Sequence, residues 1–216
     1  MKATNIQLTN LERKRDSSYA RVTIHRGTAL VKNITNRPTN KPLTLSANAY
    51  IEDKVHFNLT LGFSYSKPQF SLDGKLEKFN FQDINTVIQA YTPAKINSGI
   101  ADEIDFSGTV SRTHSSGTMK FLYHDLVVNL ELLHKARWKS SVIAFAANTA
   151  VNASNPGSTR VPPRVVRYHV DRDMHKGFIN IIIKSVLTGV KETLIMSKEN
   201  RKAYREAKKK IKGTKN

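Results

Sequence analysis

We predict from the sequence an α+β protein that is mostly β: a curved antiparallel sheet of the β-groove type, followed by an amphipathic helix and a basic tail. Three observations support this prediction. Apolar and polar residues alternate over residues 43–63, which is the period of a strand with one buried face. Apolar residues recur at helical spacing over residues 178–195, and the last twenty residues are rich in lysine.

Residues 43–63 predict two strands joined by a hairpin. Polar residues lie between the alternating apolar residues of each strand, so the pair has one apolar and one polar face. The break at residues 52–54 is typical of a hairpin turn. The alternating apolar residues are Leu43, Leu45, Ala47, Ala49, Ile51, Val55, Phe57, Leu59, Leu61 and Phe63.

Similar alternation predicts strands on both sides of this hairpin. Residues 19–34 are expected to form a strand pair broken near Arg26 and Gly27, and a turn is expected at residues 115–117. Single strands are expected at residues 70–76, 104–110, 119–123 and 126–132. The total is seven or eight antiparallel strands.

Three helices are expected among and after the strands. The first covers residues 80–90, with Asn80 as its N-cap and an end before Pro93, because proline disfavours helical geometry in the residue before it. The second covers the alanine-rich residues 138–151. The third covers residues 178–195 and is amphipathic at 100° per residue. Its apolar face consists of Phe178, Ile179, Ile182, Ile183, Val186, Leu187, Val190 and Leu194.

Positive charge is concentrated toward the C-terminus. The 216 residues include 35 Lys and Arg against 17 Asp and Glu, a formal net charge of +18. Residues 1–134 carry 16 basic and 12 acidic side chains, and residues 135–216 carry 19 and 5. Such an excess predicts anionic partners: nucleic acid, anionic lipid or acidic protein. We therefore divide the chain into a sheet with one short helix (1–134), a helical and strand part packing on the sheet end (135–196), and a Lys-rich tail (197–216).

No residue pattern predicts catalysis or a cofactor. The chain has no cysteine, and its ten glycines do not form a phosphate-binding loop. His124 and Asp125 have no serine in a nucleophile elbow. Asp102, Glu103 and Asp105 are interpreted as the solvated edge of a strand. We therefore expect a non-enzymatic protein without a cofactor.

One further pattern has the residue types of a metal site. His169, Asp171, Asp173 and His175 alternate along one segment, but successive residues of a strand rarely converge on one ion. Asp173 is interpreted instead as the cap of a helix that starts near Lys176. We expect no metal.

Neither a signal peptide nor a membrane anchor is expected in this chain. The first ten residues contain no apolar stretch. No run reaches the 18 or so apolar residues of a spanning helix.

Five groups of segments, in order over residues 30–195, resemble one protein family. They are NITN (33–36), FSLDGKLEKFNFQDIN with YTPAKINSGIADEIDF (70–106), SGTMKFLYHDLVVNL (116–130), FAANTAVNASNP (145–156) and RDMHKGFINIIIKSVLTGVKET (172–193). In these segments the chain resembles the C-terminal region of the AsmA-like (DUF748-type) envelope proteins of Gram-negative bacteria, especially the Bacteroidota branch.

The resemblance implies a long, curved, antiparallel sheet whose concave face is apolar. Members of that family are usually anchored in the inner membrane by an N-terminal helix and reach into the periplasm. They are linked to outer-membrane biogenesis and are thought to carry lipid along the groove. This chain lacks the anchor and most of the family's length, so we expect a C-terminal part of such a protein, with lipid and other envelope proteins as partners.

On this interpretation the apolar face of residues 43–63 lines a groove for lipid acyl chains. The candidate ligand-binding residues are Leu45, Ala47, Val55, Phe57, Leu59, Leu61 and Phe63. None is basic, whereas a sheet that binds nucleic acid would place Lys or Arg on its binding face. The pattern therefore favours acyl chains, and the alternative is a basic nucleic-acid-binding or ribosome-associated protein.

The last helix and the tail are candidates for contact with an anionic membrane surface. The candidate residues are Phe178, Ile182, Lys198, Arg201, Lys202, Arg205, Lys208, Lys209 and Lys210. In the alternative, the apolar helix face packs over the end of the sheet and the tail is merely solvated, so that only the tail is free to bind. Contact between the tail and nucleic acid is disfavoured, because Tyr204 is the only aromatic residue there that could stack on a base.

Overall fold

One open antiparallel sheet forms most of the structure, a computed structural model that describes residues 2–13, 19–37, 39–91, 94–130, 153–158 and 161–213. The strands are β1 (Lys2–Arg13), β2 (Tyr19–Lys32), β3 (Leu43–Ile51), β4 (Val55–Phe63), β5 (Phe70–Leu76), β6 (Phe79–Asn80), β7 (Ala94–Val110), β8 (His114–Leu130) and β9 (Val165–Asp171). The helices are the 3-10 helix η1 (Phe81–Ile84), α1 (Asn85–Tyr91), α3 (Phe178–Leu194) and α4 (Lys198–Gly213).

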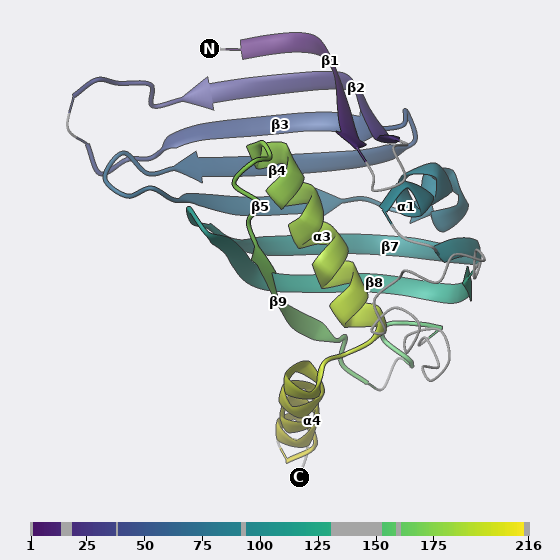
Figure 1. Ribbon diagram of the computed structural model, residues 1–216. Helices are drawn as coiled ribbons and strands as arrows, with labels where there is room; N and C mark the ends of the chain where they lie inside the picture. The colour runs from purple at the N-terminus through teal and green to yellow at the C-terminus, as the bar shows by residue number, and fades with distance from the viewer. Residues whose placement is uncertain are drawn as a thin grey trace.

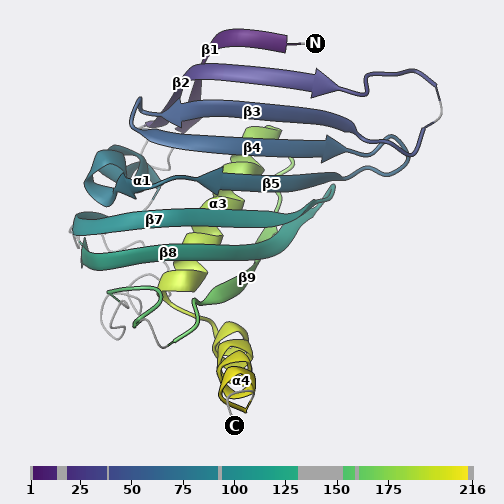
Figure 2. The same ribbon diagram turned by 180° about the vertical axis from the view of Figure 1, so that it is seen from behind.

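The strands lie in the order β1-β2-β3-β4-β5-β7-β8-β9, and the short β6 pairs with β7. α3 crosses one face of the sheet, and α4 points away from it at the β9 edge (Figure 1). The reverse view shows α3 behind the strands (Figure 2). The predicted α+β, mostly β class, with an open sheet and a C-terminal helix, is therefore confirmed.

The predicted hairpin over residues 43–63 is also confirmed. β3 pairs with β4 in unbroken register, from Leu43 opposite Phe63 to Ile51 opposite Val55. Glu52 and Asp53 have φ of 50° and 58°, the left-handed geometry that matches the twist of the flanking strands.

Three predicted interruptions are wrong, because the chain continues as strand near Arg26, through residues 115–117, and between the strands expected at 119–123 and 126–132. β2 is a single strand with a register shift between His25 and Thr28. β8 runs without a turn through residues 115–117, and the turn lies just before it, where the Ser111 amide donates to the His114 carbonyl at 2.8 Å. Gly117 serves close packing instead, because the Tyr168 hydroxyl lies 2.6 Å from where its Cβ would be.

The ends of other elements also differ from the prediction. β1 was not predicted, and β7 begins ten residues before the expected strand at 104–110. The helix expected at residues 80–90 is divided into η1 and α1, and the Asn80 side chain makes no capping hydrogen bond. The helix expected at residues 138–151 lies outside the described residues.

The hydrophobic core lies between the sheet and α3. One row of facing residues crosses the sheet from β3 to β9: Ala47, Leu59, Gly74, Phe106, Met119 and Val166. The line of α3 that is fully buried consists of Ile181, Ser185, Gly189 and Thr193. The predicted apolar face of this helix is therefore displaced by one position: Ile182, Val186, Val190 and Leu194 flank the buried line and pack against the core.

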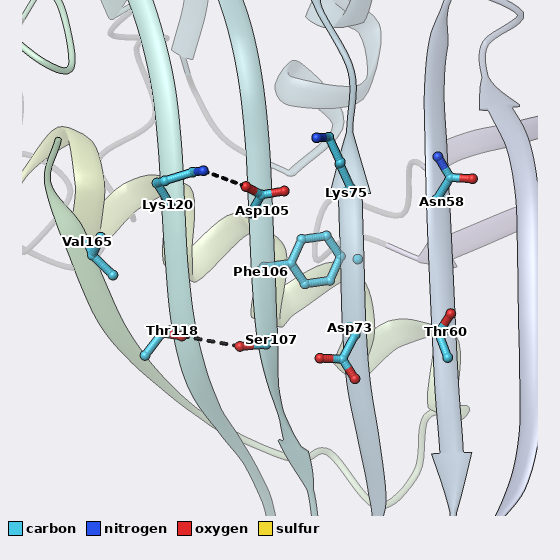
Figure 3. Close-up of a pocket in the computed structure, with 11 residues that line it drawn as sticks. Asn58, Thr60, Asp73, Lys75, Asp105, Phe106, Ser107, Thr118, Lys120 and Val165 are labelled. Carbon is cyan, nitrogen blue, oxygen red and sulfur yellow. Dashed lines mark hydrogen bonds and ion pairs between the residues drawn. The ribbon is translucent and has the colours of Figure 1, made fainter.

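Gly74 provides the space that the largest side chain of this row needs. A Cβ atom at Gly74 would overlap the ring of Phe106, which points from β7 toward β5 (Figure 3). Phe106 is buried, with 7% of its surface exposed. A side chain on β5 at this point would therefore have to displace the ring from the core.

We expect Gly74→Ala to lower the free energy of unfolding by about 1–3 kcal/mol, the usual cost of overpacking a core. Gly157→Ala is the matched control, because no atom lies within 4 Å of a Cβ built there. Urea denaturation of the two variants measures the difference, and equal stability would show that Phe106 relaxes without cost.

Candidate functional site

Helices cover the apolar face of the sheet unevenly. α3 packs against β7, β8 and β9, and α1 packs against one end of β2. The side chains between these two covers are half-buried: Leu45, Phe57, Leu59 and Phe63 pack at the margin of the core and keep part of their surface exposed. We call this surface the open apolar face; it consists of Ala29 and Val31 on β2, Leu45 and Ala47 on β3, and Phe57, Leu59 and Phe63 on β4.

Five of the seven predicted groove residues belong to the open apolar face. The other two, Val55 and Leu61, are core residues with 0% and 1% of their surface exposed, so their assignment to ligand binding is corrected. Val55 and Leu61 face the same side of the sheet as the other five residues, but they belong to the buried core. Ala29 and Val31 were missed because only the register of β2 on β3 places them beside Ala47 and Leu45.

Of the two membrane-surface residues predicted on α3, one packs on the sheet and the other is exposed. Ile182 packs against the core, so its assignment is corrected. Phe178 in the first turn is 46% exposed, and Met174 just before it is 59% exposed. Of the two alternatives for this helix, the structure has the one in which its apolar face packs on the sheet, although it packs across the face and not at the end.

The opposite face of the sheet is polar and contains a shallow cavity of about 520 Å³ (Figure 3). An ion-pair network lies beside it. Lys75 Nζ is 2.6 Å from Glu103 Oε2, and Lys120 Nζ is 2.8 Å from Glu103 Oε1 and 2.7 Å from Asp105 Oδ2. Lys75 and Lys120 are thus neutralised by neighbouring carboxylates.

Glu103 is the centre of this network. Hydrogen bonds from Lys120 and Lys75 lower its pKa from 4.5 to about 2. The same contacts raise the pKa of Lys75, through Glu103, and that of Lys120, through Asp105 and then Glu103. All three groups are therefore charged at neutral pH, and the acidic residues predicted as a solvated strand edge act as a structural ion-pair network.

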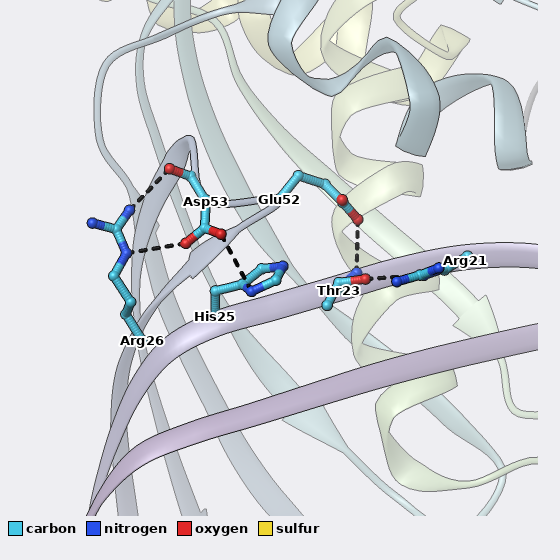
Figure 4. Close-up of polar contacts among 6 residues, drawn as sticks. All are labelled: Arg21, Thr23, His25, Arg26, Glu52 and Asp53. Carbon is cyan, nitrogen blue, oxygen red and sulfur yellow. Dashed lines mark hydrogen bonds and ion pairs between the residues drawn. The ribbon is translucent and has the colours of Figure 1, made fainter.

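Another polar cluster joins β2 to the β3–β4 turn (Figure 4). Asp53 Oδ1 accepts a hydrogen bond from Arg26 Nε at 3.1 Å, and Asp53 Oδ2 lies 3.3 Å from His25 Nδ1. The Thr23 amide donates to Glu52 Oε1 at 2.7 Å. These contacts hold the irregular part of β2 against the turn, which is a structural role.

Two histidine–aspartate pairs join residues that are close in the sequence. His124 Nδ1 is 2.8 Å from Asp125 Oδ2, and His169 Nε2 is 3.5 Å from Asp171 Oδ1. Asp173 accepts a hydrogen bond from the His175 amide at 3.0 Å. It therefore stabilises a turn and does not cap α3, which begins at Phe178 after Gly177.

Comparison with known protein families, with curated proteins and with solved structures finds no match for this chain. Within the described residues, no helix has the length and hydrophobicity needed to cross a membrane. In the same part of the chain, no group of three His, Asp or Glu residues is placed to hold a metal ion. The open apolar face is the surface on which we base a function.

We expect Glu103→Gln to lower the free energy of unfolding at pH 7 by about 1 kcal/mol, because solvent screens a network at the surface. The folded pKa is depressed, so the wild-type advantage is full above pH 4.5 and disappears as the pH falls toward 2. Thermal unfolding of the wild type and the variant over this pH range measures the difference in stability. Glu206→Gln is the control, since no ion pair of Glu206 is seen in the described structure; a loss independent of pH would contradict the assignment.

Proposed function

We propose that this protein is a non-enzymatic module that binds a lipid acyl chain on its open apolar face. The observation that supports this proposal is the row of large apolar side chains on β4, which pack at the margin of the core and stay only partly buried in the described part of the chain. In the AsmA-like envelope proteins that the sequence resembles, such a face would guide lipid in outer-membrane biogenesis in the periplasm.

The dimensions of the open apolar face suit one acyl chain. Phe57 and Phe63 lie six residues apart on β4, about 20 Å at 3.4 Å per residue. Half of a bilayer's hydrocarbon core, the depth that one chain occupies, is about 15 Å. The face also carries no ionisable side chain, so an extended hydrocarbon can lie along it without removing water from a charge.

The β2 and β3 side of the open apolar face consists partly of small residues. Ala29 and Ala47 are directly opposite each other, next to Leu59 on β4. Two alanines beside a leucine and two phenylalanines leave room that larger side chains would fill. A chain bound there would contact Leu59 and Phe57 from the side of β3.

The nucleic-acid alternative rests on the net charge alone. On the polar face of the sheet, Lys75 and Lys120 are paired with carboxylates at 2.6–2.8 Å. A phosphate would have to compete with these carboxylates for each lysine. The sheet therefore favours an apolar ligand over a polyanion.

We expect Ala47→Trp to weaken the uptake of a fluorescent fatty acid at least tenfold, because the indole fills the space beside Leu59. Ser46→Trp is the matched control, since residue 46 is the neighbour on β3 that faces the polar side. Titration by fluorescence measures binding, and native mass spectrometry of the purified protein should show co-purified lipid in the wild type and less in Ala47→Trp.

Two results would contradict the proposal. One is equal uptake by both tryptophan variants, which would place the ligand elsewhere. The other is a delipidated wild-type protein that is monomeric and stable and takes up no fatty acid.

A further inference from the structure

The most basic surface of the described structure is α4, which leaves the sheet at the β9 edge (Figure 1). Its sixteen residues include eight Lys and Arg and two Glu. The side chains of Lys198, Arg201, Lys202, Arg205 and Lys209 are exposed. In contrast to Lys75 and Lys120 of the sheet, no ion pair with a carboxylate is seen for them among the described residues.

Asn200 fixes the start of this helix to the edge of the sheet. Its side-chain amide pairs with one residue of β9, accepting from the Arg167 amide at 2.8 Å and donating to the Arg167 carbonyl at 2.9 Å. Asn200 is buried, with 5% of its surface exposed. The direction of α4 is therefore set by the sheet, and its charges are presented at a defined place.

The contacts of α4 distinguish between anionic partners. Tyr204 is half-buried and its hydroxyl donates to the Pro162 carbonyl at 3.3 Å, so the one aromatic ring of this helix is not free to stack on a base. Six of the eight cations are lysines, point charges suited to a diffuse layer of anionic groups, whereas arginine is preferred for bidentate recognition of nucleic acid. Both observations favour a lipid surface over RNA or DNA.

The apolar content of α4 points to binding at the headgroup level. Ala203 and Ala207 are exposed and small, and no large apolar side chain is exposed over residues 198–209. A helix of this kind has little hydrophobic area to insert among acyl chains. Attraction between cations and anionic headgroups, about 1 kcal/mol per basic residue near the surface, would supply the affinity.

We propose that α4 is an electrostatic docking element that holds the β9 edge of this protein against an anionic membrane surface. The cations responsible are Arg201, Lys202 and Arg205 in its exposed first half, together with the lysines that follow. This inference does not depend on acyl-chain binding by the open apolar face, which lies toward the other end of the sheet.

The test is flotation of the full chain with phosphatidylcholine vesicles that contain or lack phosphatidylglycerol. The triple variant Arg201→Gln, Lys202→Gln, Arg205→Gln should lose about a hundredfold in partition onto the anionic vesicles, since each cation contributes about fivefold. The control, Arg37→Gln, Lys41→Gln, Lys67→Gln, removes the same charge from exposed loop positions and should bind like the wild type. Binding by the wild type should be lost at about 0.5 M salt.

Several results would overturn the proposal. Equal binding to neutral vesicles would assign the contact to apolar side chains. An equal loss in both triple variants would assign it to net charge and not to α4. Absence of vesicle binding, or tighter salt-sensitive binding to a single-stranded RNA measured in parallel, would make nucleic acid the partner.

Discussion

The rest of the structure depends on the close approach of α3 to β8 and β9. A Cβ on Gly189 would lie 2.8 Å from the Met119 sulfur, and the hydroxyls of Ser185 and Ser115 are 2.8 Å apart. Small residues at every fourth position of a helix let its backbone come close to a sheet, so the larger residues on both flanks interlock with the strands. This contact buries the β7–β9 part of the apolar face.

The same contact leaves the other part of that face open for a geometric reason. A helix of 17 residues is about 26 Å long, whereas eight strands at 4.8 Å spacing span about 34 Å. One helix that starts over β4 and ends near β8 (Figure 1) does not reach β2 and β3, and no other described element covers them along most of their length. The open apolar face thus follows from a single short cover on a wide sheet.

Strict alternation in the sequence was sufficient to predict β3, β4 and the face that each residue of the hairpin joins. It failed at Gly117, because a glycine that permits close packing cannot be distinguished in sequence from one that permits a turn. It also failed to separate Leu61 from Leu59: both have the same parity, and their different exposure depends on elements distant in the chain, including α3, more than 100 residues away.

Asparagine side chains supply a second kind of contact that alternation does not reveal. Asn85, Asn155 and Asn200 each pair with both backbone groups of one residue, namely Ile96, Arg164 and Arg167. A side-chain amide has the donor and acceptor of a peptide unit, so each acts as one residue of an additional strand. At Arg167 this satisfies part of the outer edge of β9 that would otherwise accept another strand.

The contact between Asn200 and β9 helps to keep the basic surface of this chain apart from its apolar surface. On the polar face of the sheet, Lys75 and Lys120 are neutralised by Glu103 and Asp105. The cations of α4, for which no carboxylate partner is seen among the described residues, are held beyond the β9 edge by the Asn200 contact. The half-buried leucine and phenylalanine side chains of β4 lie toward the opposite edge of the sheet, away from the strands that α3 contacts most. Separating the two surfaces keeps charge away from the apolar one, because a cation beside the half-buried Phe57 or Leu59 would raise the cost of removing water from that face.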